Sequence, residues 1–303
     1  MSHYFFQIFP CRGHDFFYEE RCMNIVSSVA EVREQVKKWR SLGLSVGLVP
    51  TMGYLHEGHK SLIVRAVAEN DRVVVSDFVN PIQFGPSEDL ESYPRDIEAD
   101  ALLCEKAGAH LIFYPAPDDM YAPDFCTYVD MKGLTEGLCG KTRPTHFRGV
   151  CTVVSKLFHI VAPDRAYFGQ KDAQQLAVIR RMVRDLNFDI EIVGCPIVRE
   201  EDGLAKSSRN TYLNAEERKA AVVLSRAVNL GRSLMEHGER KASVVLAAMR
   251  ALIEGEPLAR IDYVEMVDAV SMQPVNEVRG SVLCAMAVYV GKTRLIDNFI
   301  FEG

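Results

Sequence analysis

Two histidines at the junction of a predicted strand and a predicted helix are the residues of this chain best suited to chemistry. His56 and His59 follow an apolar run at 45–49 and precede a helical pattern at 60–68. The N-terminus of a helix offers unpaired backbone N–H groups and a partial positive charge, which together attract anions. Side chains three positions apart lie on one face, so both imidazoles can donate to phosphate oxygens as charge develops on them.

A histidine pair at this position can also be a helix cap beside a surface residue, which is the commoner fate of two histidines. A metal site is a further alternative, but the zinc peptidase pattern His-Glu-x-x-His places its ligands four apart, unlike His56-Glu57-Gly58-His59. Gly58 leaves room for a base or ribose against the backbone. The pattern His-x-Gly-His is typical of nucleotide-handling α/β enzymes that transfer adenylyl groups.

A glutamine flanked by apolar residues follows the next predicted strand. Gln83 comes after a strand at 72–79 that is stopped by Asn80-Pro81. An amide both donates and accepts hydrogen bonds, so it suits recognition of hydroxyl and carboxylate oxygens on a small substrate. A glutamine that only caps a loop is the structural alternative.

A lysine stands where a predicted strand at 165–168 meets a predicted helix at 172–186. A cation at a helix N-terminus opposes the helix dipole, so Lys171 indicates an anion between the two. Asp172 suits the first turn, and Gln175 lies one turn past Lys171 on roughly the same face. An exposed lysine beside an N-terminal aspartate is the ordinary alternative.

Hydroxyl groups and cations are concentrated in the segment Lys206-Ser207-Ser208-Arg209. Two hydroxyls and two cations on a linker predict a flexible phosphate clamp. A charged loop tip is the usual alternative. Four segments with matching chemistry are much harder to explain by these ordinary structural roles than any one segment is.

Alternating strands and helices must position these segments. We predict strands at 24–26, 45–49, 72–79, 109–114, 165–168 and 188–194, helices at 28–43, 60–68, 95–107, 147–161 and 172–186, and a weaker hairpin around 127–129. Ser28 and Glu31 form a capping box that opens the first helix. This alternation predicts an α/β fold with a Rossmann-like, doubly wound, mostly parallel sheet. Ligands of such folds bind at the carboxyl ends of the strands, at the switch point.

The pattern changes after Cys195-Pro196. Helices at 215–237 and 241–254 precede strands near 261–267, 282–290 and 294–300. Helices followed by consecutive strands predict a smaller α+β domain. We therefore expect a Rossmann-like binding domain over 23–197 and a C-terminal α+β lid domain over 198–303.

Composition limits the partners and the environment. The 303 residues suffice for one large or two medium domains, and the net charge of −6 argues against general nucleic-acid binding. No apolar run reaches the roughly 20 residues of a membrane span. The eight cysteines include no Cys-x-x-Cys pair, which favours a reducing cytoplasm over a disulfide framework.

Together these segments resemble the pantoate–β-alanine ligase (pantothenate synthetase) family. The matching motifs are Pro50-Thr51-Met52-Gly53 with His56-Glu57-Gly58-His59, Phe78-Val79-Asn80-Pro81-Ile82-Gln83-Phe84-Gly85, Tyr93-Pro94-Arg95, Arg143-Pro144-Thr145-His146-Phe147, Phe168-Gly169-Gln170-Lys171-Asp172 with Gln174-Gln175, and Asp202-Gly203-Leu204 with Ser207-Ser208-Arg209-Asn210. The resemblance runs from about Met23 to the C-terminus, and its motifs are long, ordered and jointly specific.

The resemblance implies a reaction in two steps. The carboxylate of pantoate attacks the α-phosphate of ATP, which gives pantoyl adenylate and pyrophosphate. The amine of β-alanine then displaces AMP and gives pantothenate, a coenzyme A precursor. An enzyme of this kind is expected in the cytoplasm as a homodimer, with small-molecule substrates and with neither a nucleic-acid nor a membrane partner.

The resemblance also implies a role for individual residues. The implied catalytic set is His56, His59, Lys171, Ser207, Ser208 and Arg209, with His59 as the acid. The implied ATP contacts are Met52, His56, His59, Gly169, Lys171, Asp172, Val198, Lys206, Ser207, Ser208 and Arg209. Gln83 and Gln175 are expected to hold pantoate, with Gln83 also near β-alanine. Mg²⁺ accompanies the nucleotide, and Asp100 is the implied metal ligand.

One residue departs from the family pattern, and two rival functions stay open. Lys206 stands where the family usually has Met or Leu, so it adds phosphate affinity or points to water. Another His-x-Gly-His nucleotidylyltransferase or a class I aminoacyl-tRNA synthetase fragment is the enzymatic alternative, although a tRNA partner would favour a basic surface. A non-catalytic nucleotide sensor is the second rival, although a sensor could lose Lys171 or the second histidine.

The aromatic-rich segment 1–22 is expected to be dispensable. Seven of its residues are Phe or Tyr, it lacks the features of a signal peptide, and the core pattern starts after Met23. A chain that begins at Met23 should therefore keep the melting temperature and turnover of the full chain. A large drop in either would show that the segment packs on the body of the protein.

Overall fold

The computed structural model describes residues 23–86 and 88–303. The predictions about segment 1–22 lie outside this range. Within the described residues, no helix is both long and apolar enough to cross a membrane.

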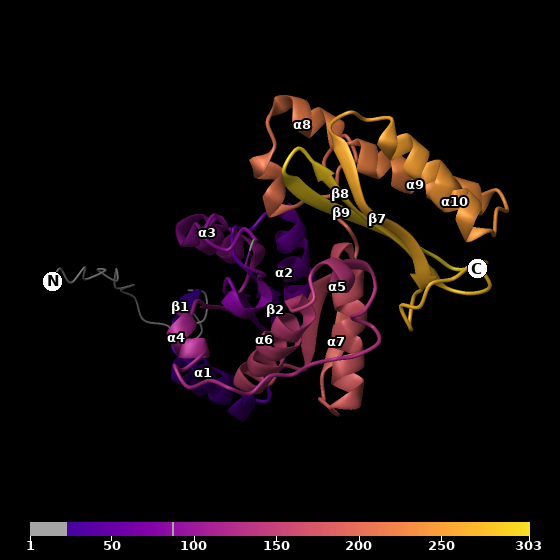
Figure 1. Cartoon of the computed structure of the whole chain (residues 1–303). Coiled ribbons are helices and arrows are strands. Elements are labelled where there is room, and N and C mark those ends of the chain that lie inside the picture. The colour runs from indigo at the N-terminus through magenta and orange to yellow at the C-terminus, as the bar shows by residue number, and fades with distance from the viewer. Residues whose placement is uncertain (1–22, 87) are drawn as a thin grey trace.

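Six parallel strands form the sheet of the larger, N-terminal part (Figure 1). In chain order they are β1 (Asn24–Val26), β2 (Val46–Thr51), β3 (Arg72–Asp77), β4 (Leu111–Phe113), β5 (Arg165–Gly169) and β6 (Glu191–Cys195). Their spatial order is β1-β4-β3-β2-β5-β6. The chain runs outward from β2 through β3 to β4 on one side and from β5 to β6 on the other. The switch point therefore lies between β2 and β5, and the predicted doubly wound sheet is confirmed.

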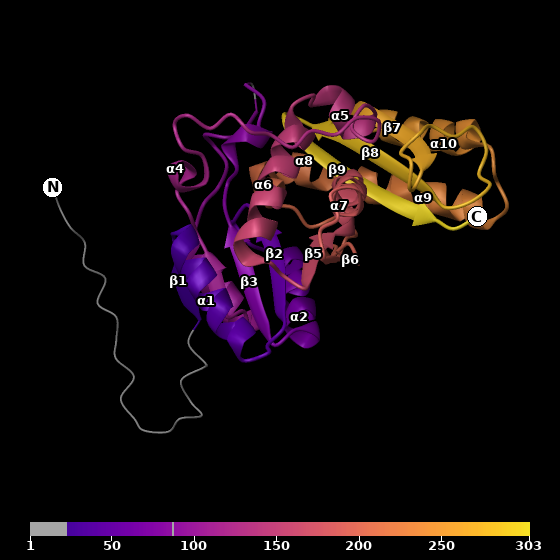
Figure 2. The ribbon, with the colours of Figure 1, turned by 90° about the horizontal axis from the view of Figure 1, so that it is seen from below.

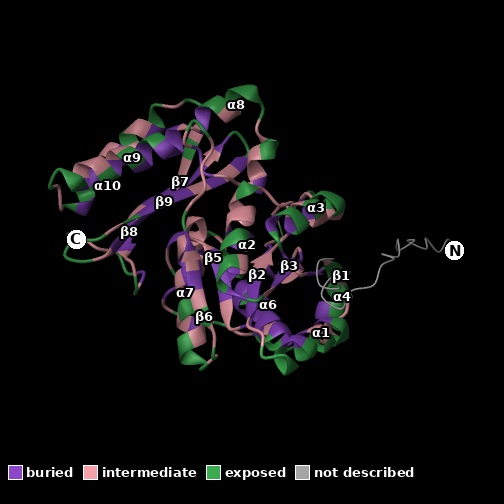
Figure 3. Ribbon diagram, turned by 180° about the vertical axis from the view of Figure 1, so that it is seen from behind, coloured by how far each residue is buried: buried purple, intermediate pink, exposed green. Residues whose placement is uncertain are grey.

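Helices cover both faces of this sheet because its strands are apolar on both sides. The covering helices are α1 (Val29–Ser41), α2 (Glu57–Glu69), α3 (Ile97–Ala107), α6 (His146–Val161) and α7 (Ala173–Asp185). Successive strand side chains alternate, so Leu48 joins the core under α1, α6 and α7, whereas Val49 joins the core under α2 and α3. Helix α6 is buried along most of its length (Figure 3). The predicted capping box of Ser28 and Glu31 is confirmed.

A three-stranded antiparallel sheet and three helices form the C-terminal part. They are α8 (Ala215–Ala220), α9 (Val223–Glu236), α10 (Ala242–Glu254), β7 (Ala259–Asp268), β8 (Val282–Val290) and β9 (Thr293–Phe301). Helices α9 and α10 cover one face of this sheet (Figure 2). From the other face, Leu283 and Ala285 share a core with Leu138 of α5 (Leu138–Thr142). The predicted α+β arrangement is confirmed, while the border between 197 and 198 stays a prediction.

The single helix predicted at 215–237 is wrong, because the chain forms α8 and α9 there. Between them Val222 N–H donates to Lys219 and Leu224 N–H donates to Ala221, which are i to i−3 bonds that tighten the turn. No glycine or proline marks this bend. Ala221 and Leu224 on either side of it both enter the C-terminal core, so packing decides its position.

The hairpin predicted around 127–129 is also wrong. The segment forms no strand, and side chains of α6 contact it instead. The backbone N–H of Val129 donates to Thr152 Oγ1 at 3.0 Å, and the Arg148 guanidinium lies 3.9 Å from the centroid of the Tyr128 ring. Side-chain partners thus replace the ladder that a hairpin would provide.

Several short helical segments have no counterpart among the predictions. They are α4 (Pro117–Met120), α5 and the 3-10 turns Pro81–Gln83, Gln170–Asp172 and Ser208–Tyr212. Segments of three to five residues are too short to show a helical period. Each of the three 3-10 turns contains one of the polar segments that the sequence analysis singled out.

Candidate active site

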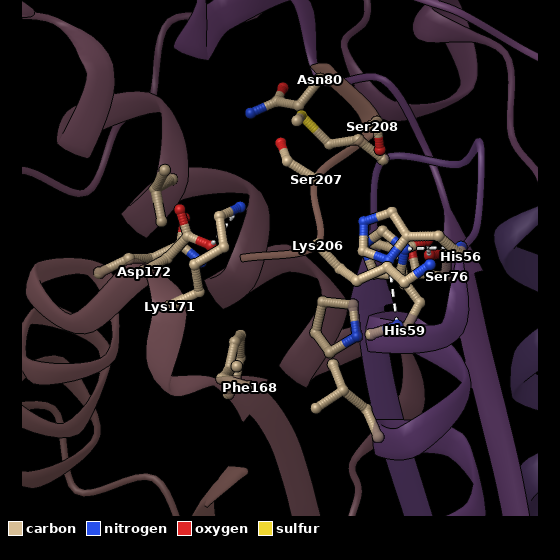
Figure 4. A pocket seen from close by; sticks show the side chains of 18 of the residues that line it. His56, His59, Ser76, Asn80, Phe168, Lys171, Asp172, Lys206, Ser207 and Ser208 are labelled. Atoms are coloured by element: carbon tan, nitrogen blue, oxygen red, sulfur yellow. Dashed lines mark hydrogen bonds and ion pairs between the residues drawn. The ribbon is translucent and has the colours of Figure 1, made fainter. Parts of the chain in front are cut away.

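One cavity at the carboxyl ends of β2, β3 and β5 collects the polar segments that the sequence singles out (Figure 4). Of the predicted site residues it is lined by Met52, His56, His59, Gln83, Gly169, Lys171, Asp172, Gln175, Val198, Lys206, Ser207, Ser208 and Arg209. Asp100 alone among them does not line it. The two histidines lie opposite Lys171 and Asp172, with Ser207 and Ser208 above the space between them. The cavity lies at the switch point, as the fold predicts.

Hydrogen bonds to the backbone set the tautomers of the two histidines. His56 is the N-cap of α2, and its Nδ1 accepts the N–H of Gly58 at 3.1 Å. His59 Nδ1 accepts the N–H of His56 at 3.3 Å. The rings stack with centroids 4.1 Å apart. Because both Nδ1 atoms accept, each neutral ring carries its proton on Nε2, which leaves that N–H free to donate to a ligand.

Burial keeps both imidazoles uncharged. Burial first, and then Lys171 and Lys206, lower the pKa of His56 to about 4. Burial, followed by His56 and Lys171, holds the pKa of His59 well below its usual value. A histidine with a lowered pKa stays neutral at pH 7. The site therefore presents two neutral Nε2–H donors, and the role of His59 as an acid stays a prediction.

Asp100 supports the loop between β2 and α2. Its two carboxylate oxygens accept the N–H groups of Tyr54 and Leu55, each at 2.6 Å. The loop turns sharply there, with positive φ at Gly53 and Tyr54. A Cβ at Gly53 would lie 2.3 Å from Asp77 Oδ1, so glycine is needed on steric grounds as well. These contacts give Asp100 a role in supporting the loop, and the metal-ligand role implied by the resemblance stays a prediction.

Asp77 is the buried neighbour of Asp100, and it is not among the residues predicted from the sequence. Burial first, and then the charge of Asp100, raises the pKa of Asp77 to about 7. Asp77 is 4% exposed, so the proton avoids placing two buried like charges side by side. The sequence feature that could have pointed to Asp77 is its position at the end of a strand next to the switch point.

Replacing Asp100 with asparagine is expected to destabilise the protein and loosen the loop before His56. The amide offers one acceptor for two N–H groups, and its own N–H₂ faces a donor, which costs about 1–3 kcal/mol of unfolding free energy. The matched variant Asp77→Asn resembles the protonated acid and should cost far less. Urea unfolding of both variants measures the difference. Equal losses would contradict the assignment.

Gln83 is buried beside the cavity. Its Nε2 lies 2.8 Å from Met52 Sδ, and its Oε1 accepts from Asn80 Nδ2 at 3.0 Å. Tyr121 Oη donates to Asn80 Oδ1 at 2.7 Å. Gly149 lets the backbone of Gln83 pack closely against α6, because a Cβ at Gly149 would lie 2.5 Å from Gln83 Cα. Asn80, interpreted from sequence only as a stop signal, therefore orients the amide of Gln83.

The cations of the site are all paired with carboxylates. Lys171 Nζ lies 3.7 Å from its neighbour Asp172, and Lys206 Nζ lies 2.9 Å from Glu200. Arg209 makes two bonds to Asp89, at 3.0 and 2.9 Å. These charge-assisted pairs hold the three cations beside the cavity. Asp89 and Glu200 were not predicted, since their partners are set by the fold.

The clamp segment is held in place by two further contacts. Ser208 Oγ donates to the backbone oxygen of Tyr54 at 3.3 Å, so the serine segment touches the loop before His56. The guanidinium of Arg209 lies 5.8 Å from the centroid of the Tyr93 ring. Loops far apart in the sequence thus meet at one point beside the cavity.

Comparison with known proteins identifies close relatives. A sequence model described as pantoate-beta-alanine ligase matches residues 24–300. The chain is 62% identical over 280 residues to the pantothenate synthetase of Clostridium acetobutylicum, covering 92% of this chain and 100% of that protein. It is 63% identical over 279 residues to the pantothenate synthetase of Ruminiclostridium cellulolyticum, covering 92% and 99% of the two chains.

Solved structures agree with these sequence relatives. Pantothenate synthetase from Thermus thermophilus superposes with a TM-score of 0.87 at 48% identity, covering 91% of this chain and 99% of that one. Pantoate-beta-alanine ligase from Francisella tularensis, in complex with beta-gamma ATP and beta-alanine, gives a TM-score of 0.75 at 31% identity. That comparison covers 92% of this chain and 98% of that one.

Proposed function

Because the chain belongs to the pantoate–β-alanine ligase family, we propose that it joins pantoate to β-alanine with ATP and so forms pantothenate. The observation that carries the proposal is the single cavity in which neutral imidazole donors, paired cations and two glutamines meet. The donors and cations suit a polyphosphate. Gln83 and Gln175 suit the hydroxyl and carboxylate oxygens of pantoate.

The first step that we propose is transfer of the adenylyl group to pantoate. A carboxylate oxygen of pantoate attacks the α-phosphorus, the bond to the bridging oxygen breaks, and pyrophosphate leaves. Attacking and attacked groups are both anionic, so positive charge and N–H donors must offset their repulsion. His56 and His59 donate from Nε2, and Lys171 adds charge from the opposite side. No protein nucleophile is required.

The second step is attack by the amine of β-alanine on the carbonyl carbon of the adenylate. The amine attacks in its neutral form, the C–N bond forms, and the bond between the carbonyl carbon and the phosphate oxygen breaks. AMP leaves, and the nitrogen gives up one proton to water and keeps the other as the amide N–H. Holding the two small molecules together removes much of the entropic barrier. An acyl adenylate also hydrolyses, so water must be kept away from it. The segment at 199–210 leads into the serine segment of the cavity and is proposed to exclude water there.

Magnesium is proposed to enter as the MgATP complex. Within the residues described, no group of three or more His, Cys, Asp or Glu side chains could hold a metal. Mg²⁺ commonly takes most of its ligands from phosphates and water. When bound, it would offset negative charge on the triphosphate and so would assist departure of pyrophosphate.

The proposal also includes a cellular location and an oligomeric state. We propose that the protein works in the cytoplasm, where a free-thiol protein is stable. We also propose a homodimer, with small-molecule substrates and no nucleic-acid or membrane partner. Sedimentation of the purified chain tests the assembly.

A turnover assay with each substrate omitted in turn tests the proposed activity. Full activity should require ATP, pantoate and β-alanine, and the products should be AMP, pyrophosphate and pantothenate. A non-catalytic nucleotide sensor would bind ATP without turnover. Another nucleotidylyltransferase would release pyrophosphate without pantoate. Either result would contradict the proposal.

A further inference from the structure

Strand β9 of the C-terminal sheet contains two successive buried polar residues close to the cavity. Asp297 is 1% exposed and Asn298 is 5% exposed. Successive side chains of a strand point to opposite faces. Asp297 therefore shares the face of Phe299, which lies in the core with α9 and α10. Asn298 shares the face of Ile296, which packs against the core of the larger part.

The side chain of Asn298 reaches across to the turn that carries Lys171. Its Nδ2 donates to the backbone oxygen of Gln170 at 3.0 Å and to that of Lys171 at 2.8 Å. This turn lies between β5 and α7, and β9 passes beside that end of α7 (Figure 2). One amide thus satisfies two carbonyl groups of the other part of the protein and restrains the peptide planes on both sides of Lys171.

Asp297 anchors the strand from which Asn298 extends. Its carboxylate accepts two bonds from Arg199, at 2.7 and 2.9 Å. Arg199 also donates to the backbone oxygen of Gly203 at 3.0 Å. Arg199 and Gly203 belong to the linker that leads directly into the serine segment of the site. The position of β9 relative to the cavity is therefore held by a bidentate pair in which Asp297 is buried and Arg199 is half-buried.

We propose that Asn298 is a positioning residue for adenylyl transfer, and that it acts by fixing the backbone of Lys171. Lys171 projects into the cavity opposite the two histidines (Figure 4). Its backbone lies in a 3-10 turn of only three residues, Gln170–Asp172. Such a short turn has few hydrogen bonds of its own. Restraint from β9 therefore holds the backbone from which the Lys171 side chain enters the cavity. The inference rests on the proposed function of the same cavity.

Coupling between Asn298 and Lys171 is the decisive measurement. Asn298→Ala, Lys171→Ala and the double variant are compared with the wild type by calorimetric titration with MgATP. Asn298→Ala should weaken MgATP binding when Lys171 is present. In the Lys171→Ala background the same change should alter the Kd by no more than about twofold, because the partner through which it acts is gone. Equal losses in both backgrounds would overturn the inference.

Adenylyl transfer gives a second readout. Misplacing a catalytic group by about 1 Å can cost about 100-fold in rate, so Asn298→Ala should slow pantoate-dependent exchange of label between ATP and pyrophosphate about 10- to 100-fold. Near-normal exchange in this variant would overturn the inference while leaving the proposed function intact. Absence of exchange in the wild type would overturn the proposed function, and the inference with it.

A matched variant separates positioning from general destabilisation of β9. Leu295→Ala removes a buried side chain from the same strand, and this side chain belongs to the core with α9 and α10 and does not line the cavity. It should lower the melting temperature and keep exchange per folded molecule. If Asn298→Ala does not fold, Asn298→Ser keeps a polar group at this position that is too short to reach either carbonyl, and it should show the same coupling. Loss of exchange in Leu295→Ala equal to that in Asn298→Ala would overturn the inference.

Discussion

Replacing His59 with alanine is expected to slow adenylyl transfer by roughly 10²–10³-fold, because it removes one preorganised donor from a buried anionic transition state. The loss should fall on the rate far more than on MgATP binding, since the contact strengthens as charge develops. Single-turnover formation of pyrophosphate in the purified variant measures it. Near-normal turnover in a folded variant would contradict this role.

The assigned tautomer of His59 predicts different rates for its glutamine and asparagine variants. The amide nitrogen of glutamine comes close to the position of histidine Nε2, whereas the amide of asparagine comes close to Nδ1. His59 is inferred to donate from Nε2 and to accept at Nδ1. His59→Gln should therefore keep part of the rate, and His59→Asn should lose as much as His59→Ala. The opposite order would contradict the assigned tautomer.

Nitrogen NMR of the histidine rings tests the same point without turnover. Because the pKa of His56 is lowered to about 4, its ring should stay neutral as the pH falls through 6.5. It should take up a proton only near pH 4. Both His56 and His59 should show the Nε2–H tautomer at pH 7. A charged ring for either at that pH would contradict the assignment.

Replacing Lys171 with alanine is expected to abolish label exchange between ATP and pyrophosphate. If pantoyl adenylate forms before β-alanine reacts, the wild type should exchange label with pantoate and Mg²⁺ present and β-alanine absent. Lys171 provides the charge opposite the histidines, and a lost cation at a transferring phosphate is among the costliest changes to such a site. Production of ADP and phosphate would indicate an acyl phosphate and refute the scheme.

Lys206 is the matched control for this experiment. It lines the same cavity, and its pair with Glu200 at 2.9 Å is closer than the pair of Lys171 with Asp172 at 3.7 Å. It also stands where the family usually has Met or Leu. Lys206→Met should therefore keep exchange within a few-fold of the wild type. A loss as large as that of Lys171→Ala would show that this chain uses Lys206 as a second essential cation.

Much of the fold follows from patterns that span only a few residues. The strand at 282–290 has the predicted bounds, and the capping box of Ser28 with Glu31 forms as predicted. Helix bonds join residues four apart and strand side chains alternate, so such features depend on near neighbours in the chain. The bend between α8 and α9 was missed because no local residue causes it.

Some features of the site also depend on local sequence, and others depend on packing. The sequence alone determined which segments carry its chemistry: the histidine pair, Gln83, the Lys171 turn and the serine segment. All four lie at the carboxyl ends of strands or on the linker. Parallel strands place such ends along one edge of the sheet, so their convergence followed from the fold class.

The partners that hold those side chains depend on tertiary packing. Arg209 takes Asp89 as its partner, Asp77 lies against Asp100, and Asn298 reaches the turn at Lys171 from a different sheet. Each pair joins elements whose distance is set by packing, not by spacing in the chain. A charged or amide side chain has many possible partners along 303 residues. Which one it meets depends on how the two sheets and their helices bury their apolar faces, a property of the whole fold.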